Sequence, residues 1–389
     1  MVIMDTQGLT LSKSTYKAAR LVSKQVAAHF SQHLSDAASV GEEDLAPEPT
    51  PEIIEAIIDA GFWTSLRKEE GHSPRISLAF LSPKAVLEPI IFEKPLMLKP
   101  KVLAKIAPGV ERAGIHLGVW YDDKDLYVWG TTRKLPAFCF VLEMVEPGLL
   151  VVKHKRFHGF GKFVNVAILK GDEIKIVDEQ SGAVPDCPQL LSSLVGFNSG
   201  DAWNSSINVL IQLATSMRAH NRGGTMLVVP SGKDKWRESI TTPISYPVLP
   251  TQSKLADLIR QDDKAKAQVA WQAELAREVD SVAGLTAVDG ATIINDVYEL
   301  IAFGAKIRRA DNSTSIEEMI MTEPIIGGEA LILHPTQIGG TRHLSAAQFV
   351  FDQRDAIALV ASQDGRFTIF GWSPCDGMVH AHRIDSLLL

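Results

Sequence analysis

The hydrophobic residues of the chain change their spacing at residue 114, from a helical period to a period of two. Alternation over 114–120 and 126–131, with the acidic turn 122–125 between them, predicts a β-hairpin. The same pattern predicts further strands, separated by short turns, at 138–145, 149–155, 163–169 and 173–178. Consecutive strands joined by short turns predict a mostly antiparallel sheet across 114–183.

Helices are predicted before this sheet. Apolar residues recur at helical spacing over 11–34, which indicates an amphipathic helix. A second, short helix is predicted over 51–60, because Thr50 is a suitable N-cap and Gly61 follows the last helical residue. The other elements predicted ahead of residue 114 are a strand and a short helix, at 75–81 and 100–107.

After residue 200 the chain alternates between helical and extended patterns. Helices are predicted at 201–217 and 253–280, and the charged run 262–266 predicts a break in the second. The predicted strands are 225–230, 289–294, 300–305, 356–361 and 367–371, the second and third forming a hairpin. The polar stretch 308–338 is predicted to be irregular. This order favours a mixed sheet flanked by helices.

The chain is long enough for two or three domains, with 389 residues. We expect a helical lead-in over 1–62, a strand-rich N-terminal domain over 63–200 and a sheet domain flanked by helices over 201–389. The predicted fold class is therefore α/β in its mixed, α+β form.

Composition narrows the function classes. The formal net charge of −7 argues against a protein dedicated to duplex nucleic acid. The three cysteines are an odd number and lie far apart, so neither a disulfide framework nor a Cys-rich zinc site is expected. The N-terminus has no export signal, and no apolar run approaches the roughly 20 residues of a membrane span. We expect a cytoplasmic protein.

The first candidate site motif is Asp289-Gly290-Ala291, at the start of a predicted strand. A carboxylate at that position can bind a metal ion or a ribose hydroxyl, while Gly290 lets a ligand approach the backbone. Asp-Gly is also among the commonest turn pairs, so the motif alone is a weak signal.

The second motif is Gly339-Gly340-Thr341-Arg342-His343, which leads into a predicted helix. The first N–H groups of a helix are unpaired and partly positive, which suits an anion such as phosphate. Arg342 adds a planar fork for phosphate, and Thr341 and His343 add further donors. The alternative is an ordinary glycine loop with a capping Thr and a surface Arg. No P-loop and no dinucleotide-binding glycine pattern is present.

Together these motifs resemble the diadenylate cyclase (DAC) domain family, which carries Asp-Gly-Ala and then Gly-Thr-Arg-His followed by Ala-Ala. The resemblance covers about 201–372 and includes strands at 222–229, 355–360 and 365–369. It implies a domain that binds an adenine nucleotide, ATP or a cyclic dinucleotide, with Mg²⁺ or Mn²⁺. In active members two domains face each other, and the product is cyclic di-AMP.

The resemblance also implies a role for each motif residue. Asp289 would meet the attacking 3′-hydroxyl and the metal, and it would be the catalytic residue of an active enzyme. Gly290 and Ala291 would lie along the nucleotide, with Gly290 against it. Thr341, Arg342 and His343 would hold the phosphates, and Gly340 would also belong to the nucleotide-binding site.

Three departures from the family pattern weaken the case for catalysis. The Arg expected after His343 is Leu344, followed by an additional Ser345. One carboxylate expected after a later Ser is an amide in this chain, Gln363. Loss of a cation and an anion harms phosphoryl transfer more than binding. The missing cation could be replaced only from elsewhere, by Lys306 or Arg354.

These departures resemble the DACNV branch, which is proposed to sense nucleotides rather than make them. The N-terminal part of that branch is similar to 114–178, including Trp120 and Trp129. The leading hypothesis is therefore a nucleotide-binding sensor with impaired catalysis. The alternatives are an active diadenylate cyclase and a non-enzymatic scaffold with an empty pocket. A face-to-face homodimer and a signalling partner of unknown kind are expected in addition.

Overall fold

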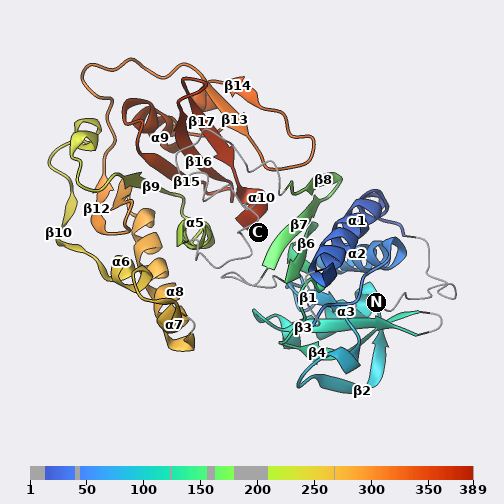
Figure 1. Ribbon diagram of the computed structural model, residues 1–389. Coiled ribbons are helices and arrows are strands. Elements are labelled where there is room, and N and C mark those ends of the chain that lie inside the picture. Colours follow the sequence, from blue (N-terminus) through green and yellow to red (C-terminus); the bar gives the residue numbers. More distant parts are fainter. Residues whose placement is uncertain are drawn as a thin grey trace. The chain divides into compact units, whose positions relative to one another are not determined.

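The computed structural model describes residues 14–39, 44–122, 125–155, 163–178, 209–266 and 268–388. Its contacts divide the chain into two compact units, which meet in the sequence between Val177 and Asp178 (Figure 1). We call the described residues before this point unit 1 and those after it unit 2. Each unit contains one mixed β-sheet with helices packed on it, which confirms the predicted fold class.

Unit 1 has an eight-stranded sheet in the order β2-β4-β3-β1-β5-β6-β7-β8. Its strands are β1 (Ser77–Phe80), β2 (Ile90–Met97), β3 (His116–Tyr121), β4 (Leu126–Thr132), β5 (Phe140–Glu146), β6 (Leu149–Lys155), β7 (Phe163–Lys170) and β8 (Glu173–Ile176). Its helices are α1 (Lys17–Ser39), α2 (Pro51–Ser65), α3 (Pro100–Val110) and the 3-10 turn η1 (Pro83–Ala85).

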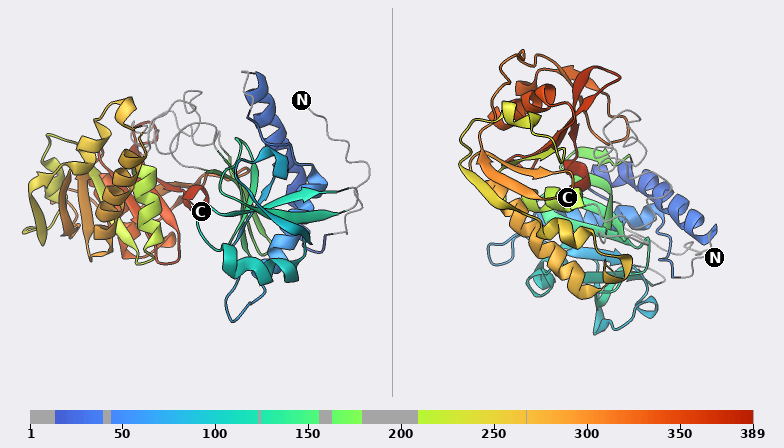
Figure 2. Two further views of the ribbon diagram at one scale, coloured as in Figure 1. Left: turned by 90° about the horizontal axis from the view of Figure 1, so that it is seen from below. Right: turned by 60° about the vertical axis from the view of Figure 1, so that its left-hand side comes forward.

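The helices of unit 1 cover one face of its sheet. Helix α2 contacts β5 and β6, and α1 contacts β7 and β8 (Figures 1 and 2). Alternate strand residues point to opposite faces. Leu78 and Phe80 of β1 therefore join the main core under the helices, whereas Ala79 joins a smaller core on the other face with Trp129. The predicted lead-in helices thus share a core with the strands.

The predicted hairpin is confirmed as β3 and β4, and Thr50 caps α2 through its side chain. The sheet is mostly antiparallel, as predicted, and β1 with β3 is its parallel pair. Two expectations were wrong. Helix α2 continues beyond Gly61, where a Cβ would lie 2.5 Å from Leu142 Cδ2, so glycine there allows close approach to β5. Helix α3 continues through Pro108 to Val110.

Unit 2 has a nine-stranded sheet in the order β10-β12-β11-β9-β15-β16-β17-β13-β14. Its strands are β9 (Gly224–Val229), β10 (Tyr246–Gln252), β11 (Ala291–Asn295), β12 (Leu300–Ala305), β13 (Met319–Thr322), β14 (Leu331–Leu333), β15 (Ile357–Ala361), β16 (Phe367–Ser373) and β17 (Met378–Arg383). Its helices and 3-10 turns are α5 (Val209–Ala219), η3 (Lys235–Ser239), α6 (Lys254–Ile259), α7 (Asp263–Lys266), α8 (Val269–Gly284), η4 (Leu285–Ala287), η5 (Pro335–Gln337), α9 (Thr341–Asp352) and α10 (Asp385–Leu388).

Helix α9 packs against the central strands of unit 2. It contacts β9, β15, β16 and β17, and its Phe349 and Val350 share a core with Leu227 of β9 and Val360 of β15. Met226, the neighbour of Leu227, is also buried and points to the opposite face. Helix α5, which packs against α8, contacts β15 as well (Figure 1).

The break predicted at 262–266 is confirmed, since α6, α7 and α8 occupy that stretch in place of one helix. The hairpin of β11 and β12 is confirmed as well. The expectation of an irregular 308–338 was wrong, because β13 and β14 lie within it. β13 pairs in parallel with β17, far along the sequence, and local periodicity carries no signal for such pairing. The first part of the helix expected at 201–217 lies outside the described residues.

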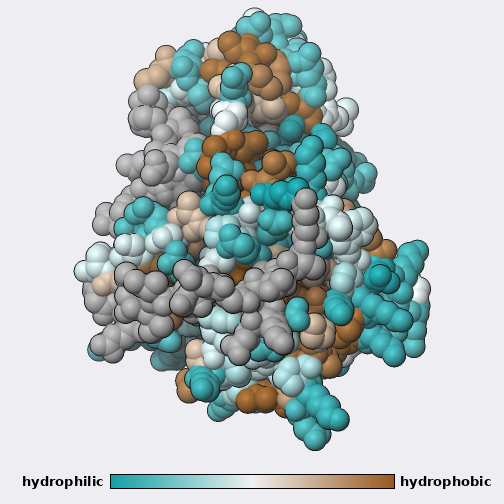
Figure 3. Space-filling model, turned by 90° about the vertical axis from the view of Figure 1, so that its right-hand side faces the viewer, coloured by the Kyte–Doolittle hydropathy of each residue, from teal (hydrophilic) through white to brown (hydrophobic). Residues whose placement is uncertain are grey.

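Among the described residues, no helix combines the length and apolar character needed to cross a bilayer. On the face drawn in Figure 3, hydrophobic side chains form separate patches among hydrophilic ones. Cytoplasmic localisation and the three-part division at 62 and 200 stay predictions.

Candidate functional site

Both motifs of unit 2 lie at one end of its sheet. The strand registers pair Ala291 with Thr225 and with Ala305, and they pair Gly224 with Ala361. The first residues of β9 and β11 therefore lie beside the last residues of β12 and β15. We call this the motif end of the sheet.

Asp289 projects into solvent just before β11. Its side chain is 92% exposed, and Lys306 Nζ, directly after β12, donates a hydrogen bond of 2.5 Å to Oδ2. The hydrogen bond and charge of Lys306 hold the pKa of Asp289 below its ordinary value. The positive charge of Arg342 lowers that pKa further, so the second motif lies within electrostatic reach of the first.

Gly290 is required by the packing of the strands. Its φ is +114°, a conformation that side chains rarely adopt, and a Cβ would lie 2.5 Å from the carbonyl carbon of Gly304. The next residue, Ala291, is buried and begins β11. The fold thus accounts for glycine at 290, and contact of Gly290 or Ala291 with a nucleotide stays a prediction.

Helix α9 begins at the motif end with Gly340 as its N-cap. Thr341 and Arg342 occupy the first turn and are exposed, as the anion-site prediction requires. Arg342 Nη1 lies 3.0 Å from the position that a Cβ on Gly223 would take, so the guanidinium lies against the start of β9. Within the described residues, Arg342 has no hydrogen bond or ion pair.

His343 points into the protein, unlike its two neighbours. It is 3% exposed, packs edge-on against Phe370 and closes over Gly339, where a Cβ would meet its ring. Burial lowers the pKa of His343 to about 4, so the ring is neutral at pH 7. Its Nε2 has no hydrogen-bond partner among the described residues. A phosphate contact from His343 stays a prediction.

The departures from the cyclase pattern have structural counterparts. Leu344 packs against the core of unit 2. Gln363 Nε2 donates a hydrogen bond of 3.4 Å to the Arg222 carbonyl, and Asp364 forms an ion pair with Arg366. Arg354 precedes β15 at the opposite end of the sheet, so it cannot supply the missing cation. Lys306 is at the motif end but is bound to Asp289.

No group of three or more His, Cys, Asp or Glu residues is arranged to hold a metal ion in the part of the chain that the structure describes. Asp289 as a metal ligand therefore stays a prediction that rests on one carboxylate.

The comparisons with known proteins bear mainly on unit 1. A family model described as "Probable sensor domain DACNV" matches residues 43–133. This segment of the chain is therefore similar to a family of probable sensor domains. The match begins before the predicted region of similarity, 114–178, and includes Trp120 and Trp129. It covers α2, α3 and β1–β4 of unit 1.

Among solved structures, the chain is similar to a double mutant of DacA from Staphylococcus aureus. The identity is 14%, the match covers 44% of this chain and 83% of that chain, and the TM-score is 0.23. No curated protein matches the chain.

Proposed function

We propose that the protein is a nucleotide sensor, in which the motif end of unit 2 binds an adenine nucleotide or a cyclic dinucleotide. The observation that carries this proposal is that Asp289 and Arg342, about 50 residues apart in the sequence, lie at the same end of one sheet. Asp289 lies just before the start of β11, and the Arg342 guanidinium lies against the start of β9, the strand that pairs with β11. The exposed Arg342 fork and the first turn of α9 suit a phosphate group.

Impaired catalysis is part of the proposal. A cyclase needs Asp289 for a divalent cation and for the attacking hydroxyl, whereas Lys306 occupies its carboxylate. Leu344 offers no charge to the phosphates, and Gln363 offers an amide in place of a carboxylate. These features leave phosphate recognition intact while they remove groups that offset charge during phosphoryl transfer.

The binding experiment titrates the full chain with ATP and with cyclic di-AMP, using calorimetry. We expect saturable binding of one of them, and Arg342→Ala should weaken it about 10- to 100-fold, the effect of losing charge-assisted hydrogen bonds. Arg260→Ala is the matched control, because Arg260 is an exposed arginine that pairs with Glu299, just before β12 at the other end of the sheet. Unchanged affinity in Arg342→Ala would refute this binding site.

An active cyclase is the second candidate function, because the carboxylate of Asp289 is highly exposed to solvent. A turnover assay distinguishes it from the sensor. The protein is incubated with ATP and Mn²⁺ or Mg²⁺, and cyclic di-AMP is measured by mass spectrometry. The sensor proposal expects binding without product. Product that disappears in Asp289→Asn would establish the cyclase, and absence of both binding and product would leave the scaffold.

A face-to-face homodimer follows from the cyclase resemblance, because each active pair joins two such sites. We include it in the proposal, together with a signalling partner of undefined kind. Sedimentation with and without nucleotide tests the dimer.

A further inference from the structure

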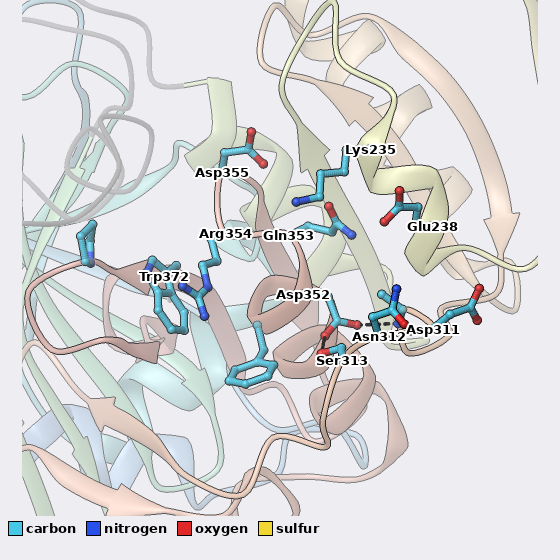
Figure 4. A pocket seen from close by; sticks show the side chains of 13 residues that line it. Lys235, Glu238, Asp311, Asn312, Ser313, Asp352, Gln353, Arg354, Asp355 and Trp372 are labelled. Carbon is cyan, nitrogen blue, oxygen red and sulfur yellow. Dashed lines mark hydrogen bonds between the residues drawn. The ribbon is translucent and has the colours of Figure 1, made fainter.

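A cavity of about 870 Å³ lies in unit 2 where α9 ends, away from the motif end (Figure 4). It is lined by η3, by the loop 310–313, by the residues that join α9 to β15 and by the end of β16. Helix α9 has 12 residues, so the cavity lies about 18 Å from the first turn of that helix. The volume is in the range of small-molecule sites.

The wall of the cavity is held by hydrogen bonds to Asp352. The backbone N–H of Ala310 and the Gln348 amide each donate to its carboxylate at 2.8 Å, and the Ser313 hydroxyl donates at 2.5 Å. Asp352 thereby fastens the loop 310–313 to the end of α9. The cavity is preformed, and this carboxylate is already satisfied.

The charges that line the cavity are unevenly paired. Asp311 pairs with Arg308 at 2.7 Å, and Asp355 pairs with Lys233 at 2.8 Å. Arg354 and Lys235, in contrast, have no carboxylate partner within the described part of the chain. Asp352 is satisfied by hydrogen bonds, and Glu238 is a lining carboxylate that also has no ion pair within the described part of the chain. Arg354 and Lys235 remain available to an anion.

The guanidinium of Arg354 stacks on an indole ring. Its guanidinium carbon lies 3.9 Å from the centre of the Trp372 ring, and Trp372 is buried with Phe351 packed edge-on against it. A guanidinium stacked on an indole keeps its N–H edge free to donate, and that edge matches two oxygens of a phosphate. In Figure 4 Arg354 extends toward Trp372, while Lys235 comes from η3 on another side of the cavity.

We propose that this cavity binds a phosphorylated small molecule, with the phosphate between Arg354 and Lys235. Glu238 and Asn312 also line the cavity and supply acceptors for hydroxyl groups, so a sugar phosphate is the ligand class that uses both kinds of group. The proposal does not depend on nucleotide binding at the motif end, because no residue is shared.

The test uses ribose 5-phosphate as the probe and ribose as its uncharged counterpart, titrated into the full chain by calorimetry at low salt. We expect ribose 5-phosphate to bind saturably and ribose not to bind. Arg354→Gln and Lys235→Gln should each weaken binding about tenfold or more. Arg354→Lys should bind more tightly than Arg354→Gln but less tightly than the wild type, because Lys lacks the planar fork of Arg. Arg260→Gln changes an exposed arginine that pairs with Glu299, outside both proposed sites, and it should leave the affinity unchanged.

Lys235 is exposed, so Lys235→Gln tests the site without disturbing the packing of Trp372. The proposal is overturned if ribose 5-phosphate shows no saturable binding to the wild-type chain up to about 10 mM. It is also overturned if Lys235→Gln leaves the affinity unchanged, or if Arg260→Gln weakens binding as much as Lys235→Gln does.

Discussion

Replacing Gly290 by alanine tests whether the motif end is a rigid frame. The φ of +114° is nearly restricted to glycine, which costs about 1–3 kcal/mol for alanine. The new Cβ would also lie 2.5 Å from the carbonyl carbon and 2.8 Å from the carbonyl oxygen of Gly304. These are backbone atoms, which cannot rotate away, and such overpacking costs about 1–3 kcal/mol more.

Gly290→Ala should therefore lower the free energy of unfolding by about 2–6 kcal/mol. Native-state hydrogen exchange of β11 and β12, read by mass spectrometry, measures the change in unit 2 alone. The control is Gly232→Ala, since Gly232 also has a positive φ, +70°, but nothing lies within 4 Å of its Cβ position. That variant carries only the backbone cost, about 1–2 kcal/mol. If both variants lost the same free energy of unfolding, the backbone of β12 would have moved to make room for the new Cβ. The argument for a rigid frame would then fail.

Three further predictions follow from described contacts. Burial lowers the pKa of His343 to about 4. Between pH 6.5 and pH 4 this imidazole is therefore protonated in the unfolded chain but neutral in the folded chain. Stability present above pH 6.5 should fall by about 3 kcal/mol as the pH drops to 4, and urea titrations should show a smaller fall in His343→Met. Gly118→Ala should cost about 3 kcal/mol in unit 1, because its Cβ would lie 2.1 Å from the Trp129 ring, whereas Gly109→Ala, in open space, should not destabilise; chemical denaturation compares them. Lys306→Gln should raise the affinity for Mn²⁺ severalfold, measured by electron paramagnetic resonance, because the ammonium competes for the Asp289 carboxylate; no gain would contradict that competition.

The elements that sequence patterns predicted well are those whose partners are close in the chain. The hairpin of β3 and β4 and the hairpin of β11 and β12 need only alternation and a turn. The strands that were missed include β2, β10, β13 and β14. β2 and β10 are edge strands that contain prolines, and β13 depends on β17, so none presents a clear alternating pattern.

The candidate site was predictable in part. The motifs locate Asp289 and Arg342, and the strand order explains why both lie at one end of the sheet. The ion pair of Asp289 with Lys306 and the burial of His343 depend on the side-chain packing of separate segments, which the sequence pattern does not encode. No sequence motif marks the cavity beside Arg354, because the residues that line it come from separate segments of unit 2.

The packing of Gly290 and His343 changes how short sequence motifs should be used to assign enzymes. Gly290 is needed so that two strand backbones can touch, and His343 fills the space above Gly339. A protein could therefore retain both positions for architectural reasons after losing every step of its chemistry. When such motifs are used to assign a function, the solvent-facing residues Asp289, Thr341 and Arg342 should be assessed separately from the buried residues of the same motifs.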